Sequence, residues 1–148
     1  MNTESAPAPP ITEESELDRE LLEVARGIAE VTWELKGLNT VVIDLRGRVS
    51  YTDFVIVTTG TSDRHVNALA KRIDEAMADA DRKPLGTEGT DQGRWALLDY
   101  GDIIVHVFNR QARKDYDLER MWSEAPRLDL DDAPSDLYGH FEAEGFEV

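Results

Sequence analysis

The sequence predicts an α/β (α+β) protein: a mixed β-sheet with packed helices, in the order α-β-β-α-β-β-α. Two apolar stripes have the spacing of helices, and four short apolar runs rich in β-branched residues have the composition of strands. Glycine-containing turns separate these segments. The 148 residues are 41% hydrophobic, which is enough to build the core of one compact domain.

The first helix is predicted from a stripe of apolar residues that repeats every three or four positions. The stripe consists of Leu17, Leu21, Val24, Ile28, Val31 and Leu35. Gly37 follows it and ends the helix. We expect this stripe to pack against the sheet, although a heptad spacing of this kind can also form the seam of a dimer. A homodimer is therefore predicted, because the stripe and the apolar strands offer more surface than one small domain covers.

Two strands and a second helix come next. Residues 41–45 and 54–58 are β-branched, continuous runs joined by a turn through residues 46–48. The second run leads into Gly60-Thr61-Ser62 and then into a helix with its apolar residues on one face, over residues 63–77. Thr61 or Ser62 can cap the first free amides of that helix.

A hairpin and a short helix complete the predicted fold. After Pro84 and a glycine-rich loop, residues 94–98 and 103–108 flank the turn Asp99-Tyr100-Gly101-Asp102. The last helix is expected over residues 116–122, before Pro126.

A two-residue hairpin turn predicts which side chains share a face. In this register Trp95 lies opposite His106, Leu97 opposite Ile104, and Asp99 opposite Asp102. The other face is wholly aliphatic, with Leu98 opposite Ile103 and Ala96 opposite Val105, and is expected in the core. The first face combines aromatic, aliphatic and acidic side chains, which is typical of a protein-binding surface. The alternative is that a helix of the same chain covers it.

The charge distribution indicates the kind of partner. The net charge is −15, and the two ends carry most of it: residues 1–18 hold five acids, and residues 129–148 hold seven, without Lys or Arg. We predict a disordered, Pro-rich acidic extension over 1–16, a domain over 17–128, and an acidic, flexible tail over 129–148. The acidic balance argues against DNA binding and suits a basic protein.

The cellular location is predicted from features that the sequence lacks. Cysteine is absent, and the sequence shows neither a signal peptide nor an apolar run of membrane-spanning length. We therefore predict a cytoplasmic protein that does not enter a membrane.

Catalytic signals are weak. The turn Gly60-Thr61-Ser62 could bind phosphate at a helix N-terminus, as a similar turn does in nucleotidyltransferases, with Asp44, Asp53 and Asp99 as metal ligands. However, Asp44 stands alone on its strand, and no D-x-D follows. The three histidines, His65, His106 and His140, are not at metal-ligand spacing. The sequence therefore predicts a binding protein without a cofactor or a metal, and the enzyme remains the alternative.

Several segments together resemble one known family. They are Thr52-Asp53-Phe54, Thr59-Gly60-Thr61-Ser62 with Arg64-His65-Val66, the stretch from Gly93 to Phe108, and the stretch from Tyr116 to Trp122. In order and spacing they resemble the ribosome silencing factor family, also called the Iojap family, over about Leu21 to Leu128.

The resemblance implies a nucleotidyltransferase-like fold without catalytic carboxylates, and a translation repressor in place of an enzyme. Members bind the large ribosomal subunit through ribosomal protein L-fourteen at the inter-subunit face and block joining of the small subunit when nutrients are scarce. Organellar relatives help large-subunit assembly, and bacterial relatives form dimers.

The family's partner surface corresponds to Trp95 and the strand and turn after it, up to Asp102, which overlaps the hairpin face. The predicted partner-binding residues are Trp95, Leu97, Asp99, Tyr100, Asp102, Ile104 and His106.

Overall fold

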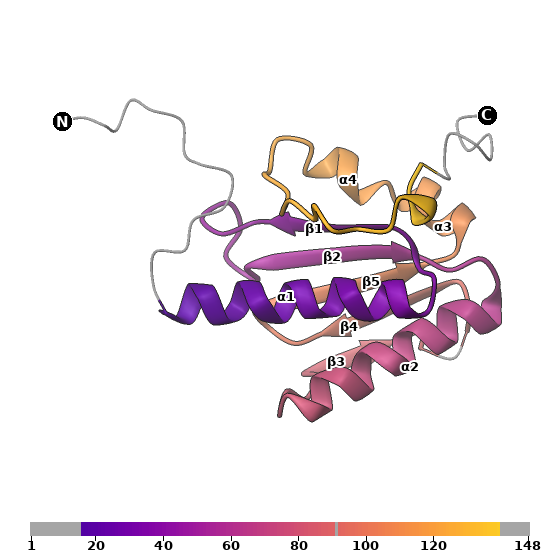
Figure 1. Cartoon of the computed structure of the whole chain (residues 1–148), viewed down its shortest axis with the longest axis horizontal. Coiled ribbons are helices and arrows are strands. Elements are labelled where there is room, and N and C mark those ends of the chain that lie inside the picture. Colours follow the sequence, from indigo (N-terminus) through magenta and orange to yellow (C-terminus); the bar gives the residue numbers. More distant parts are fainter. Residues whose placement is uncertain (1–15, 91, 140–148) are drawn as a thin grey trace.

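The computed structural model describes residues 16–90 and 92–139, and its centre is a five-stranded sheet (Figure 1). The strands are β1 (Leu38–Asp44), β2 (Phe54–Thr59), β3 (Gly86–Glu88), β4 (Trp95–Asp99) and β5 (Ile103–Phe108). Their order across the sheet is β1-β2-β5-β4-β3. β2 and β5 are parallel and the other neighbours are antiparallel, so the predicted mixed sheet is confirmed.

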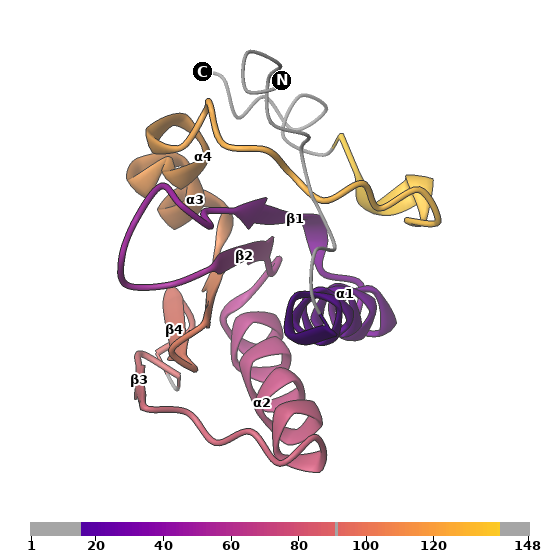
Figure 2. The ribbon, with the colours of Figure 1, turned by 90° about the vertical axis from the view of Figure 1, so that its left-hand side faces the viewer.

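Helices pack on both faces of the sheet, but unequally. The long helices α1 (Glu16–Glu34) and α2 (Asp63–Asp79) lie together on one face, whereas the short helices α3 (Arg110–Tyr116) and α4 (Leu118–Met121) lie on the other, near β1 and β2 (Figure 2). A 3₁₀ turn, η2 (Ser135–Leu137), follows. The prediction lacked β3, α3 and η2; its last helix, over residues 116–122, corresponds to α4 alone. α3 and α4 are separated at Asp117, whose left-handed φ of 49° interrupts the helix.

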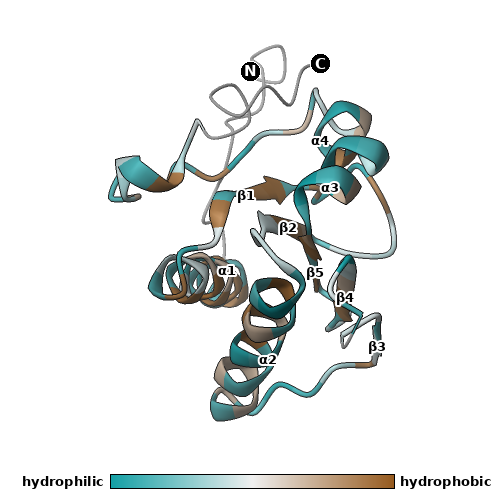
Figure 3. Ribbon diagram, turned by 90° about the vertical axis from the view of Figure 1, so that its right-hand side faces the viewer, coloured by the Kyte–Doolittle hydropathy of each residue, from teal (hydrophilic) through white to brown (hydrophobic). Residues whose placement is uncertain are grey.

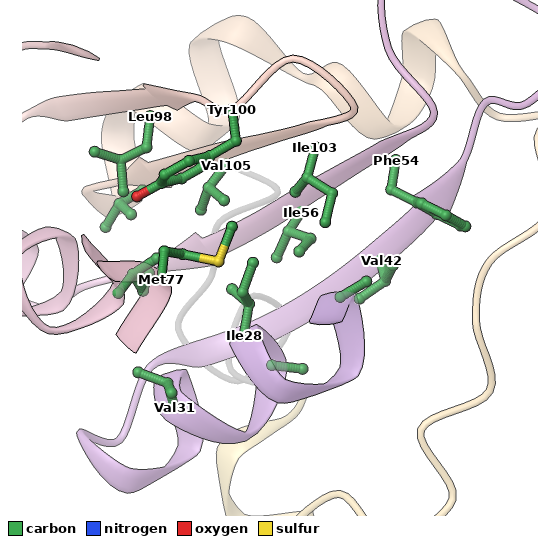
Figure 4. Packing of buried hydrophobic residues seen from close by; sticks show 14 of the residues in the cluster. Ile28, Val31, Val42, Phe54, Ile56, Met77, Leu98, Tyr100, Ile103 and Val105 are labelled. Atoms are coloured by element: carbon green, nitrogen blue, oxygen red, sulfur yellow. The ribbon is translucent and has the colours of Figure 1, made fainter. Parts of the chain in front are cut away.

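The main core lies between the long helices and the sheet (Figure 4). Ile28 and Val31 of α1 and Met77 of α2 meet alternate strand residues such as Ile56 and Val105. The α1 stripe therefore packs within the chain, except for Leu17, which is 77% exposed. Most of the predicted dimer seam is thus used for intramolecular packing.

The register of the β4–β5 hairpin differs from the prediction by two residues. Asp99 pairs with Ile104, and Leu97 pairs with His106, so Asp99 and Asp102 do not oppose each other. A two-residue primed turn would need left-handed backbone at Tyr100, but only Gly101 adopts it, with φ of 89°. A shift of two keeps every side chain on its predicted face, because strand side chains alternate with a period of two.

The segment after α4 corrects the prediction of a flexible tail from residue 129. We call residues 126–139 the C-terminal strap. It runs along the outer edge of β1, where the Asp44 amide donates to the Pro126 carbonyl and the Leu128 amide donates to the Val42 carbonyl. Further on, the strap contacts α1, because Arg26 pairs with Asp132 at 2.6 Å.

The other end of the strap is also fixed, since Leu137 is buried. The tail prediction was wrong for residues 129–139 because their partners, such as Arg26, lie about a hundred positions away in sequence. Residues 1–15 and 140–148, to which the other terminal predictions apply, lie outside the described residues. Among the helices of the described residues, none is long and apolar enough to span a bilayer.

Candidate partner-binding surface

The outward side chains of β4 and β5 form a surface that the long helices do not cover. We call it the open face; its members are Trp95, Leu97, Asp99, Ile104 and His106, all partly exposed. Alternation along the strands produces it, since every second residue of β4 and β5 is buried under α1 and α2. Figure 3 shows hydrophobic strands inside, with the outer surfaces of α2 and α3 mainly hydrophilic.

An aromatic cluster holds Trp95 in place on this face. The Trp95 indole Nε1 donates a hydrogen bond of 3.0 Å to His106 Nδ1. The Trp95 ring lies 4.8 Å from that of Tyr116 and 6.1 Å from that of Phe108, measured between centroids. Tyr116 comes from α3, whose N-terminus is capped by the Asn109 side chain accepting from the Ala112 amide. Trp95 is therefore preorganised, with part of its ring exposed.

The protonation state of His106 agrees with this geometry. Burial lowers the pKa of His106 to about 4, so its imidazole is neutral at pH 7. Only a neutral imidazole can accept the Trp95 indole N–H at Nδ1.

Carboxylates gather where the open face meets the β4–β5 turn. The Asp99 carboxylate accepts from the Gly101 amide at 2.9 Å, and the Asp102 carboxylate accepts from Arg82 at 3.0 Å. Asp53 is adjacent, because its amide donates to the Asp102 carbonyl. Burial, and then the charge of Asp102, raise the pKa of Asp53. This edge of the open face is therefore acidic.

The structure brings together five of the seven predicted partner-binding residues and separates Tyr100 from them. The Tyr100 side chain lies on the face covered by α1 and α2, is 7% exposed, and donates to Asp74 at 2.7 Å. Burial, with the hydrogen bond to Asp74, raises the Tyr100 pKa. Its side chain is thus a core group. Asp102 lies on the turn, at the margin of the open face.

Sequence reasoning missed two members of the aromatic cluster, Phe108 and Tyr116. Phe108 was assigned to a strand, and alternation would have placed it with Trp95 and His106. Tyr116 could not be placed, because it reaches Trp95 only through the direction of α3. The N-cap Asn109 was the available signal for the start of that helix.

The alternative phosphate site is already occupied by contacts within the chain. The Ser62 hydroxyl accepts from the His65 amide, and the Thr61 amide donates to His65 Nδ1 at 2.9 Å. Gly60 is needed for close packing, since a Cβ there would lie 2.8 Å from the Val66 nitrogen. These contacts account for the Gly-Thr-Ser turn as a capped helix start.

The proposed metal ligands of that alternative are not assembled. The Asp44 carboxylate forms two hydrogen bonds of 2.9 Å with the Arg46 side chain. Within residues 16–90 and 92–139, no three His, Cys, Asp or Glu side chains are grouped as metal ligands would be.

Comparison with known proteins finds similarity to one family. Residues 18–144 match the model of the family described as "Ribosomal silencing factor during starvation". Ribosomal silencing factor RsfS of Bacillus subtilis is 37% identical over 89 residues, which span 60% of this chain and 75% of that protein. The match extends beyond the resemblance seen in the sequence, since it includes the strap.

A solved structure and a more distant relative agree with the family match. A crystal structure of a Chromobacterium violaceum protein has a TM-score of 0.67 and 33% identity, and it covers 69% of this chain and 85% of that one. The mouse protein named "Mitochondrial assembly of ribosomal large subunit protein 1" is 30% identical over 86 residues, or 55% of this chain and 37% of that protein.

Proposed function

The chain belongs to the family of ribosomal silencing factors, and on that premise we propose that it binds the large ribosomal subunit through its open face. The partner we propose is ribosomal protein L-fourteen, at the surface where the small subunit docks. The bound protein then excludes the small subunit sterically and represses translation under nutrient limitation, in the cytoplasm. The name of the mouse relative supports the choice of the large subunit.

One observation carries the proposal: a preorganised, partly exposed tryptophan lies at one end of β4 on the open face, and an acidic edge lies at the other end of the same strand. Truncation of a tryptophan at the centre of an interface often costs about 2 kcal/mol or more. Because Trp95 is already hydrogen-bonded to His106 and stacked on His106 and Phe108, binding loses little side-chain entropy. Asp99 and Asp102 match a basic partner and favour its approach.

Steric exclusion requires no cofactor and no chemical step. One bound copy needs only to occupy area that the small subunit would bury. Binding and inhibition of subunit joining should therefore be lost together in any variant of the open face.

Substitution of Trp95 tests the proposal directly. We expect Trp95→Ala to weaken co-sedimentation with large subunits about thirtyfold or more, and to abolish inhibition of subunit joining. Leu17→Ala removes an exposed apolar side chain from α1, outside the open face, and should leave binding unchanged.

A second variant distinguishes a loss of binding from a loss of folding. Leu97→Arg places a cation on the open face without removing the aromatic cluster, and it should also prevent binding while the urea midpoint stays near that of the parent. Normal binding by either folded variant would overturn the assignment of this surface.

A further inference from the structure

Two adjoining hollows lie between β1, the short helices and the C-terminal strap, away from the open face. One has a volume of about 370 Å³ and the other about 300 Å³. They share Val41, Arg127 and Tyr138 in their linings, and we refer to the two adjoining hollows together as the groove. Volumes of this size are common for sites that bind small molecules.

The polar end of the groove contains an unused hydrogen-bond donor. Asn39 lies at an irregularity in β1, where pairing with β2 shifts between Leu38 and Val41, and its φ is 52°. Its Oδ1 accepts from the Gly139 amide at 2.8 Å. Its Nδ2 is buried and has no partner in the described part of the chain. Strained residues and bulges of this kind concentrate at functional sites.

The same end of the groove carries two arginines, Arg113 and Arg127. Arg113 is buried and paired with Glu119, and its Nη1 donates to Thr59 Oγ1 at 3.0 Å. Arg127, in contrast, has no ion-pair partner among residues 16–90 and 92–139. Arg127 therefore supplies a cation that none of the described carboxylates pairs with at this end of the groove.

The opposite end is apolar. Val41, Leu130 and Ala133 line it, and Leu128 packs between the strap and the main core. The Tyr138 hydroxyl separates the two ends and is fully engaged, since it donates to the Thr40 carbonyl and accepts from Trp33 Nε1 at 3.0 Å. A ligand therefore meets hydrogen-bond donors and charge at one end and aliphatic side chains at the other.

We propose that this groove binds a small organic anion, a carboxylate carried on a short apolar body. The planar Arg127 guanidinium donates to both oxygens of the carboxylate, at the end of the groove where Asn39 lies. The apolar body lies against Val41 and Leu130. The proposal does not depend on ribosome binding, because the groove shares no residue with the open face.

Trp33 provides a local reporter, because its indole N–H is bound to Tyr138 in the groove wall. In a ¹H–¹⁵N spectrum of the full chain, titration with hexanoate should shift the Trp33 indole peak in a saturable manner and leave the Trp95 peak in place. Hexylamine, of similar shape and opposite charge, should not shift it. Inorganic phosphate, which lacks the apolar body, should bind at least several times more weakly than hexanoate.

Two substitutions test where the anion binds in the groove. Asn39→Asp keeps the acceptor for Gly139 but replaces the free donor by a negative charge, and Arg127→Gln removes the free cation. Each should weaken hexanoate binding about tenfold or more. Arg48→Gln, an exposed arginine on the β1–β2 loop, is the matched control and should bind as the parent does.

The proposal is overturned if hexanoate fails to saturate, if both variants bind it as the parent does, or if phosphate or hexylamine binds equally well. Loss of binding in Arg48→Gln would also contradict it, because that result would indicate a diffuse effect of net charge.

Discussion

The two faces of the sheet differ in how completely helices cover them. On the face of α1 and α2, the side chains of the central strands are almost wholly buried, including Phe54, Ile56, Ile103 and Val105. On the opposite face, α3 and α4 cover β1 and β2 but leave much of β4 and β5 partly exposed. The same strands supply both faces, so one face can be optimised for stability while the other remains available to a partner.

The largest effect should follow from a cavity under the long helices. Leu69 of α2 is fully buried, so Leu69→Ala should lower the free energy of unfolding by about 2–5 kcal/mol. Leu97→Ala, on the open face, should cost about 1 kcal/mol or less. Urea denaturation of both variants measures the contrast, and equal losses would show that the open face is as tightly packed as the covered one.

Acid should destabilise the open face through His106. Burial lowers the His106 pKa to about 4, against 6.5 in the unfolded chain, so its contribution to stability is complete above pH 6.5 and is lost as the pH falls toward 4. At pH 5 the loss amounts to about 2 kcal/mol. In His106→Gln, whose side chain does not titrate, the decrease in stability between pH 7 and pH 5 should be smaller by that amount. Identical pH profiles would mean that His106 is solvated in the native state.

Fixation of the C-terminal strap on the α1 side of the molecule can be tested at Tyr138. Tyr138→Phe removes a hydroxyl that bridges Trp33 and the Thr40 carbonyl, and it should cost about 1–2 kcal/mol. Arg26→Gln removes ion pairs that are partly solvated and should cost about 1 kcal/mol or less. Thermal unfolding would separate the two, and a Tyr138→Phe protein with unchanged stability would show that the strap contributes little.

The smallest effect should concern the rate of association. Asp99→Asn keeps the shape and the acceptor for Gly101, so the fold should be unaffected. We expect association with large subunits to slow severalfold at low salt and to match the parent at high salt, because salt screens long-range attraction. Glu75→Gln, on the exposed side of α2, changes the net charge equally and should have less effect. Equal slowing by both would assign the effect to total charge.

Local patterns were sufficient to predict most of the fold. The stripe of α1 and the β-branched runs of β1, β2, β4 and β5 are strong signals, because burial imposes their period. β3 was missed, since Gly86–Glu88 is short and exposed and exists through its pairing with β4. The strap was missed because its contacts depend on residues distant in sequence, such as Arg26 and Trp33.

Only part of the candidate surface was predicted, because some of its geometry also depends on contacts between residues distant in sequence. Alternation placed Trp95, Leu97 and His106 on one face regardless of register. The register itself depended on Tyr100, whose ring is held under α2 by Asp74, a tertiary contact that no turn rule contains. The same contact explains why Tyr100, adjacent to Asp99 in sequence, belongs to the other face.

The strap also decides how two copies of this chain could associate. Along β1 its backbone already uses the outward amide of Asp44 and the outward carbonyl of Val42, so this end of β1 is closed to a strand from a second molecule. The other edge, β3, offers only three residues, and one of them is Glu88. A continuous sheet running through a pair of molecules is thus disfavoured at both ends, as is fibrous growth. A homodimer, if formed by the described residues, would therefore use side-chain contacts in place of strand pairing.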